Sequence, residues 1–242
     1  MQLNKIYRYY GIPTAQVYAH MKEKFTEAFT GFEGVSFETV EATEETADDG
    51  TVTTTPEQYI IYLDNDKSTW LKLYVNTSGY PTMAVYFKNG TSVAFNNAIS
   101  GTLANPYRQF NIVRTVYGVA FSGIGATTNA TEILEDRHIT SFFVVGNPNL
   151  FVYTKSTSST GGTANDYIFS SLHEMPEIHN NYSTLNGSTV SRTKLFNFSS
   201  LVYPIDCEHL YRIVFTDGNV GRIKINDRYF IMGTRYALEY IP

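Results

Sequence analysis

The residues best suited to chemistry in the last part of the sequence are a thiol and an imidazole. Cys207 and His209 stand in the run Ile-Asp-Cys-Glu-His, with carboxylates beside them. Residues two apart on a strand share one face of a sheet, and a cysteine beside a histidine can act as a nucleophile. Side chains this close in sequence rarely form a working dyad with an oxyanion hole, so we predict a structural thiol.

Two more histidines stand at a spacing that does not suit a metal. His173 and His179 enclose the run Glu-Met-Pro-Glu-Ile. Zinc proteases place two histidines four apart on one helix, with a glutamate between them. Pro176 would break a helix at this point. We therefore predict a polar loop and no metal site.

Two other motifs have simple structural interpretations. Asp64, Asp66 and Ser68 match the first positions of a calcium loop, but Val75 stands where the distal glutamate is needed. The glycine-containing run 122–128 lacks the lysine and the spacing of a phosphate-binding loop. We expect a turn at the first motif and a strand bend at the second. No pair of carboxylates is singled out for glycoside hydrolysis either, so we predict no catalytic residue and no cofactor.

The composition indicates a β-rich scaffold. The chain has 242 residues, with 19 Tyr, 16 Phe and only 17% charged residues, whereas globular chains usually carry about a quarter. Aromatic residues and Thr favour strands, and Asn and Ser favour turns. A helical bundle, a coiled coil and a doubly wound α/β enzyme are therefore disfavoured. Aromatic residues that alternate on strands, Trp70 included, are expected to be core and not sugar-stacking platforms.

Strand-length segments recur at spacings of roughly ten residues through most of the sequence. Clear hairpin turns are Asn89-Gly90 and the four residues 146–149. A regular meander is expected over 207–242. These patterns predict a mainly β fold, an antiparallel β-sandwich or jelly-roll-like domain.

The first part of the sequence has a different character. Residues 14–30 place apolar side chains at helical spacing between Pro13 and Gly31, which predicts one amphipathic helix. Residues 33–57 contain eight acidic residues and neither Lys nor Arg. This stretch is predicted to be a solvated acidic loop or linker.

These observations predict two regions. Residues 1–57 form an N-terminal arm with the helix and the acidic loop, and residues 58–242 form the β-sandwich domain. A further split near 173–206, where few regular runs occur, is left open. The meander over 207–242 would then stand apart.

The short segment before the helix is the best local candidate for contact with a neighbour. It contains Tyr7, Arg8, Tyr9 and Tyr10 in succession. Tyr and Arg are favoured at protein interfaces because each combines contact area with directed polar groups. Packing of this segment against its own domain explains it equally well, so both interpretations stay open.

Charge and hydropathy exclude several partners. A net charge of −5 argues against a nucleic-acid partner bound through phosphate contacts. The longest apolar runs fall far below the roughly 18 residues of a membrane span, and the N-terminal residues lack the apolar segment of a secretory signal. With one Cys, the chain has no intrachain disulfide framework.

Two stretches show the character of the amino-acid composition most clearly: LKLYVNTSGYPTMAVYFKNGTSVAF at 71–95 and GRIKINDRYFIMGTRYALEY at 221–240. Their β-rich character, heavy in Thr, Asn and Tyr and poor in Cys and charge, resembles the virion structural proteins of tailed bacteriophages. The resemblance implies a neck, tail, baseplate or capsid accessory subunit, made in the bacterial cytoplasm and located in the virion. Such a subunit is a homo-oligomer that also contacts other virion proteins, through edge strands, loops and terminal arms.

Three functions follow, in order of preference. The first is a non-enzymatic structural subunit of a phage particle. The second is a carbohydrate- or receptor-binding β-sandwich module of a phage tail, for which exposed aromatic residues and a glycan ligand are required. The third is a glycan-active hydrolase, which needs two carboxylates facing one another across a cleft.

Overall fold

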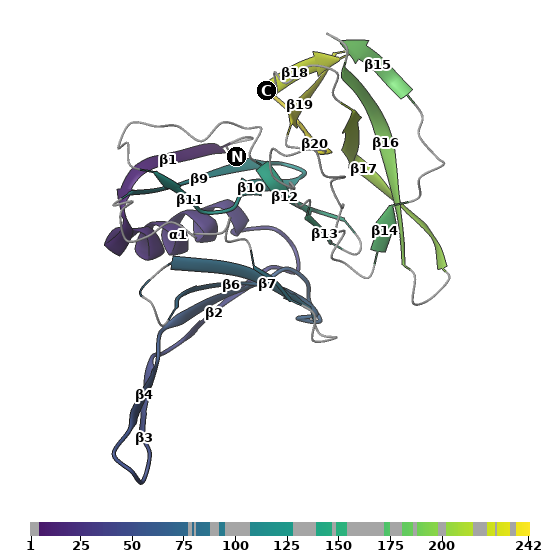
Figure 1. The fold of residues 1–242 in the computed structure, drawn as a ribbon. Helices are drawn as coiled ribbons and strands as arrows, with labels where there is room; N and C mark the ends of the chain where they lie inside the picture. Colours follow the sequence, from purple (N-terminus) through teal and green to yellow (C-terminus); the bar gives the residue numbers. More distant parts are fainter. Residues whose placement is uncertain are drawn as a thin grey trace, which may run out of the picture. The chain divides into compact units, whose positions relative to one another are not determined.

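The fold is mainly β, with antiparallel sheets and, among the described residues, one helix near the N-terminus, as predicted (Figure 1). The computed structural model describes residues 5–76, 79, 81–87, 92–94, 107–127, 139–146, 149–153, 172–174, 181–185, 188–197, 202–214, 222–225, 227–232 and 236–242. Over these ranges, no helix has the length and apolar character that crossing a membrane requires.

The chain divides into two compact units, each drawn from separate stretches. Unit 1 contains Met1–Arg8, Asn111–Gly123 and Leu134–Pro242, and unit 2 contains Tyr9–Phe110 and Ile124–Ile133. The expected boundary after residue 57 is not among these limits. The physical reason is that the helix packs its apolar side on the strands that follow residue 57, which places both in unit 2.

Unit 2 is built around α1 (Thr14–Phe29), which follows strand β1 (Lys5–Pro13). Pro13 precedes the first turn, where a missing N–H costs nothing. The apolar residues of the helix recur every three or four positions and are buried: Val17, Met21, Phe25, Ala28 and Phe29. The helix ends where the Thr30 N–H donates to the Thr26 carbonyl at 2.9 Å and Gly31 takes a φ of 84°.

A five-stranded antiparallel sheet covers one side of α1, with the order β2-β5-β6-β7-β8. Its strands are β2 (Ser36–Val40), β5 (Gln58–Tyr62), β6 (Thr69–Val75), β7 (Pro81–Phe87) and β8 (Ser92–Ala94). The predicted β7–β8 hairpin is confirmed by the pairing of Val85 with Val93, while its Asn89-Gly90 turn lies outside the described residues. The helix is also covered elsewhere in unit 2, because the Phe25 ring lies 6.1 Å from the Phe110 ring.

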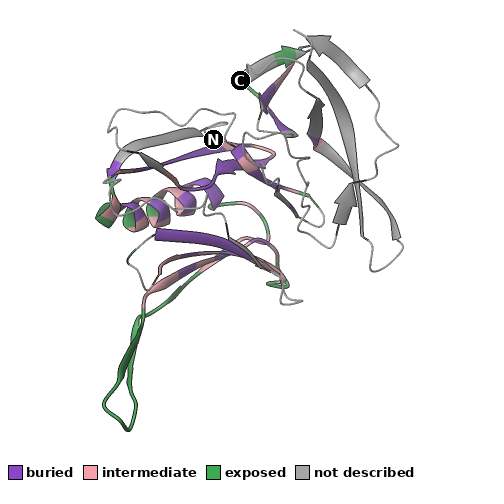
Figure 2. Ribbon diagram, viewed as in Figure 1, coloured by how far each residue is buried: buried purple, intermediate pink, exposed green. Residues whose placement is uncertain are grey.

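Strands β3 (Thr43–Thr46) and β4 (Val52–Thr55) pair with one another and stand between β2 and β5 in the chain. We call residues 41–56 the acidic arm. Every residue of both strands is exposed, and Figure 2 shows this ribbon extending from the sheet into solvent. The predicted acidic loop is therefore wrong in conformation but right in its exposure. Thr has a high β-propensity, and the Ala47 N–H closes the hairpin on the Thr51 carbonyl at 2.9 Å.

A six-stranded sheet has the order β1-β9-β10-β12-β13, with β11 paired to β9. Its remaining strands are β9 (Tyr107–Thr115), β10 (Gly118–Ser122), β11 (Gly125–Thr127), β12 (Ile139–Val144) and β13 (Leu150–Tyr153). The predicted hairpin around residues 146–149 is confirmed, since β12 and β13 are antiparallel neighbours.

A seven-stranded sheet in unit 1 has the order β14-β16-β17-β20-β19-β18, with β15 paired to β16. Its strands are β14 (Leu172–Glu174), β15 (Asn181–Leu185), β16 (Ser188–Asn197), β17 (Val202–Val214), β18 (Arg222–Ile225), β19 (Arg228–Met232) and β20 (Tyr236–Tyr240). The predicted C-terminal meander is confirmed for β18, β19 and β20, which pair in chain order. It is wrong for β17, which pairs with β20 and not with β18. The irregularity expected over 173–206 is corrected, because its polar Thr- and Ser-rich segments form strands despite a weak apolar pattern.

The core of unit 1 joins strands that are distant in sequence. Its cluster of buried residues is Val113, Ala120, Ile139, Phe142, Val144, Leu210, Ile231 and Leu238. Tyr117 and Tyr240 pack against this cluster while remaining partly exposed.

Candidate functional site

The sheet of unit 2 buries aliphatic side chains and Tyr59 on the face towards α1, and carries partly exposed aromatic rings on its other face. Side chains alternate along a strand, so the burial of Leu71 and Leu73 leaves Trp70, Lys72 and Tyr74 on the opposite face of β6. Cross-strand pairing adds two more rings to this face, because Trp70 lies opposite Tyr62 on β5 and Tyr86 on β7. We call this surface the aromatic–lysine face: Tyr62, Trp70, Lys72, Tyr74 and Tyr86, all partly exposed.

In the central row, the Trp70 ring contacts the ring on either side of it. The Trp70 ring lies 5.8 Å from the Tyr86 ring with an interplanar angle of 9°, and 6.3 Å from the Tyr62 ring at 54°. Aromatic cross-strand pairs stabilise a sheet. A group of adjacent, partly exposed rings is also what protein surfaces use for binding.

Lys72 lies within this aromatic surface. Its Nζ is 5.1 Å from the Tyr74 ring centre and 5.5 Å from the Tyr86 ring centre, which are cation–π distances. Burial lowers the pKa of Lys72, and burial together with the neighbouring Tyr86 raises the pKa of Tyr74. Among the described side chains, no carboxylate forms an ion pair with Lys72. The centre of the face therefore offers an anion a partly dehydrated cation.

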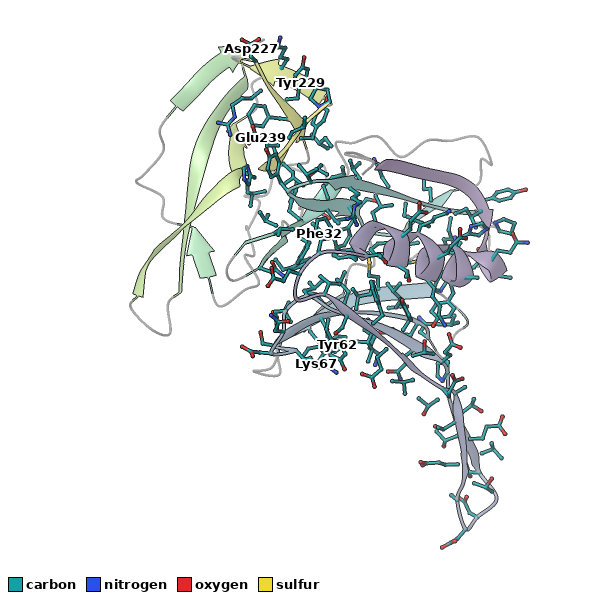
Figure 3. The ribbon with its side chains drawn as sticks, turned by 180° about the vertical axis from the view of Figure 1, so that it is seen from behind. Phe32, Tyr62, Lys67, Asp227, Tyr229 and Glu239 are labelled. Atoms are coloured by element: carbon teal, nitrogen blue, oxygen red, sulfur yellow. The ribbon has the colours of Figure 1, made fainter. Side chains whose placement is uncertain are left out.

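A second lysine lies at the end of the face. The Lys67 Nζ is 4.2 Å from the centre of the Tyr62 ring, and Figure 3 shows both residues on the side of the sheet away from α1. The Tyr62 hydroxyl donates to the Glu38 carboxylate at 2.8 Å, and this hydrogen bond raises the pKa of Tyr62. The Tyr62 ring is thereby fixed between a cation and an anion.

The turn predicted around Asp64 is confirmed. This turn positions Lys67 at the end of the face. The Asp64 carboxylate accepts hydrogen bonds from the backbone N–H groups of Ser68 at 2.7 Å and Thr69 at 2.9 Å, and from the Ser68 hydroxyl at 2.9 Å. Lys67 itself has a φ of 50°, which closes the turn. Asp64 therefore stabilises the turn that connects β5 to β6.

The acidic arm has two chemically different sides. Opposed residues of a ribbon share a side, so the pairs Glu44–Thr54 and Thr46–Val52 lie together, and Glu45 lies on the other side with Thr53. Val52 is 57% exposed, more than the other large exposed hydrophobic residues described. In the part of the chain that is described, neither Glu44 nor Glu45 forms an ion pair. One side of the arm therefore combines a free carboxylate with an exposed apolar side chain.

The root of the arm is tied to the helix. The Glu57 carboxylate accepts hydrogen bonds from the Lys22 ammonium and the Tyr18 hydroxyl, each at 2.9 Å. The bond from Lys22 is the main reason that the pKa of Glu57 is lowered, and burial raises the pKa of Tyr18. Thr26 and Tyr59 add a hydroxyl contact of 2.6 Å. The arm thus starts from a fixed base.

Unit 1 contains a separate cluster of ionisable groups. The His209 ring stacks on the Tyr117 ring at 3.6 Å, and its Nδ1 is 3.1 Å from the Glu239 carboxylate. Arg228 donates to both oxygens of the same carboxylate, at 2.6 Å from Nε and 2.5 Å from a terminal nitrogen. Strand β17 carries Cys207 as well as His209, but the Cys207 side chain lies outside the described residues. His209 therefore has a carboxylate and an aromatic ring as its described partners.

Replacing Glu239 with Gln is expected to destabilise unit 1 by about 1–3 kcal/mol at neutral pH, because it removes the charge that pairs with Arg228 and His209. Burial alone would raise the pKa of Glu239, but the hydrogen bonds from Arg228 and His209 outweigh it and hold that pKa below its usual value. A lowered folded-state pKa means that the stabilisation is present above the unfolded-state value and is lost as the pH falls through the folded-state value.

Urea unfolding of the wild type and E239Q across the acidic range measures this. The difference between the two proteins is expected to shrink steadily below about pH 4. An equal difference at all pH values would show that the charge of Glu239 contributes nothing. Asp227→Asn, which breaks a fully solvent-exposed pair with Lys224, is the control and should change little.

The remaining sequence-predicted residues are placed as follows. Tyr7, Arg8, Tyr9 and Tyr10 lie in β1, beside β9 in their own sheet, and their side chains lie outside the described residues. His173 is in β14, which contradicts the predicted polar loop at that position, and His179 lies outside the described residues. Over the described residues 122–127 the predicted bend is confirmed, because β10 ends at Ser122 with a shift in register and β11 begins at Gly125; residue 128 lies outside the described residues. The Ser122 hydroxyl accepts a hydrogen bond from the Asn111 N–H at 2.8 Å.

Sequence reasoning missed both the aromatic–lysine face and the strands of the arm. Trp70 is not core, because it lies on the outer face of the sheet; the order Trp-Leu-Lys-Leu-Tyr along β6 was the available signal, since its Leu residues must take the inner face. Across the described residues, no group of three His, Cys, Asp or Glu side chains is arranged to hold a metal ion.

Comparison of the chain with protein families, curated proteins and solved structures finds no match.

Proposed function

We propose that this chain is a non-enzymatic structural subunit of a phage particle, which assembles through protein–protein contacts. The observation that carries the proposal is the acidic arm, a two-stranded ribbon whose strand residues are all exposed. An isolated two-stranded hairpin is only marginally stable in water, and both of its edges are open to pairing. A neighbouring protein that covers the ribbon would stabilise it.

The aromatic–lysine face supports the same proposal. Tyr and Trp are enriched at interfaces, where they bring large contact area at a low cost in conformational entropy. The proposed partners are copies of this chain and other virion proteins, in the virion. The assignment to a phage particle rests on the resemblance of the sequence texture, and the arm and the face support the assembly role.

Sedimentation velocity on the purified full chain tests the assembly role, with a matched variant in which residues 43–55 are replaced by Asn-Gly. This turn suits a two-residue hairpin, and the fluorescence of Trp70, the only Trp, reports whether the sheet stays folded. The full chain is expected to form larger species with rising concentration, and the shortened variant is expected to remain smaller. A full chain that stays monomeric alone and when co-expressed with its genomic neighbours would contradict the proposal.

A second candidate function is a carbohydrate-binding module, which the partly exposed Trp70 and its neighbouring Tyr rings favour. Sugars stack on such rings, and a binding module would use the face without any change in oligomeric state. A glycan array probed with the full chain and with Trp70→Ala separates the two functions. Binding by a monomer that disappears in W70A would replace the first proposal with the second.

A further inference from the structure

Glu44 of the acidic arm and Lys72 of the aromatic–lysine face are opposite in charge, and neither forms an ion pair among the described side chains. The arm belongs to a stretch, residues 33–57, with eight acidic and no basic residues. Because the whole chain has a net charge of −5, the rest of it carries a net charge of +3. A second copy of the chain therefore presents a surface that the arm of the first copy can pair with.

We propose that the arm of one copy docks on the aromatic–lysine face of a second copy, with the side of the ribbon that carries Glu44 and Val52 against Lys72 and its surrounding rings. This inference rests on the proposed assembly function and names its partner. Glu44 supplies the carboxylate partner that Lys72 lacks among the described residues of its own chain. Val52 supplies an apolar side chain that packs against the Tyr74 and Tyr86 rings.

The dimensions of the two parts suit this contact. Each strand of the arm, counted from the sheet to the turn, has about seven residues and so reaches roughly 20–25 Å at 3.3 Å per residue. The face covers three adjacent strands, which are about 10 Å across between the outer two. One arm can therefore cross the whole face of a neighbour.

The contact has to be between copies. The arm is a separate two-stranded sheet that leaves the five-stranded sheet between β2 and β5, and β5 is also one of the strands that carry the face. Figure 1 shows the arm leading away from that sheet, and the Glu57 contacts with Tyr18 and Lys22 fix its root. An arm held in this way does not fold back onto its own face.

A contact between two different surfaces of the same chain can be made reciprocally or head to tail. A reciprocal exchange of arms between two copies would close a two-fold dimer, and a head-to-tail series of the same contact would build closed rings or open filaments. The charge pairing predicts that raised salt weakens the assembly.

Two half-defective variants test the proposal. Glu44→Lys reverses the charge on the arm and leaves the face unchanged. Lys72→Glu reverses the charge on the face and leaves the arm unchanged. Each variant alone is expected to associate at least about tenfold more weakly than the wild type. Mixed together, they offer two contacts of opposite charge: the unchanged arm of K72E on the unchanged face of E44K, and the charge-reversed arm of E44K on the charge-reversed face of K72E. The mixture is therefore expected to regain the assembly that each variant alone has lost. Glu45→Lys, on the other side of the ribbon, is the matched control and should assemble like the wild type.

Analytical ultracentrifugation separates the outcomes, with Trp70 fluorescence confirming that each variant is folded. Wild-type assembly that neither E44K nor K72E weakens would overturn the inference while leaving the proposed function standing. A mixture that stays as small as either variant alone, or an effect of E45K equal to that of E44K, would overturn the stated contact. A wild type that remains monomeric alone, yet assembles with a different virion protein, would show that the arm serves that protein and not a second copy.

Discussion

Replacing Gly118 with Ala is expected to lower the free energy of unfolding by about 3–5 kcal/mol, which is a large part of the 5–15 kcal/mol typical of a domain. Gly118 begins β10, with Thr115 of β9 and Val144 of β12 as its paired neighbours. Its φ is 150°, and a Cβ added to it would lie 1.9 Å from the backbone oxygen of Phe143. The obstacle is backbone in a central strand, so it cannot be relieved by a change of rotamer.

The measurement is urea unfolding by circular dichroism, with amide hydrogen exchange over residues 139–144 as a local readout. Faster exchange in this segment is expected, because β12 must shift away from β10. Gly31→Ala is the control: its φ is 84°, but nothing lies within 4 Å of the added carbon. It should cost only the backbone strain of about 1–2 kcal/mol. A G118A variant as stable as G31A would contradict the observed strand register.

Replacing Phe25 with Ala is expected to destabilise unit 2 by about 3–5 kcal/mol. Phe25 is fully buried, and its ring lies 6.2 Å from the Phe29 ring and 6.1 Å from the Phe110 ring. The substitution removes the side chain that joins the helix to β9, and leaves a cavity that the packed sheet on the other side of the helix cannot fill. Unfolding followed by Trp70 fluorescence reports on this unit, because Trp70 belongs to it.

Gln16→Ala in the same helix is the matched control for Phe25→Ala. Gln16 is exposed, and Ala has the best helix propensity, so the change should lie within about 0.5 kcal/mol of the wild type. If F25A and Q16A unfolded at the same urea concentration, Phe25 would not be a core residue.

Local patterns were sufficient for the elements that depend on local interactions. The helix followed from apolar residues three and four apart between Pro13 and Gly31, and the β7–β8 and β12–β13 hairpins followed from their turns. The strands of the arm could not be predicted in this way, because their side chains are all exposed. An alternation of apolar and polar residues arises only where one face of a strand is covered. The pairing of β1 with β9 could not be predicted either, because strands this far apart in the sequence leave no local signal of their pairing.

The candidate site was harder to predict than the fold, and for a different reason. An aromatic residue on a strand gives the same sequence signal whether its face is covered or open. The sequence therefore predicts a core position for Trp70, although Leu71 and Leu73 already occupy the covered face of β6. The charge of the arm was visible in the sequence, but that Glu44 and Val52 share one side of it depends on the β3–β4 register.

The order of strands in the five-stranded sheet also bears on how the chain folds during synthesis. The strands β5 to β8 pair with their successors in the chain, and β2 joins them around the arm, so this sheet has a low contact order. It can form on the ribosome with α1 as soon as residue 94 has emerged. Strand β1, which ends at Pro13, has to wait for β9, which begins at Tyr107. Until then the nascent chain holds a folded sheet and a helix whose Phe25 still lacks Phe110, and this is the stage at which it most needs protection from aggregation.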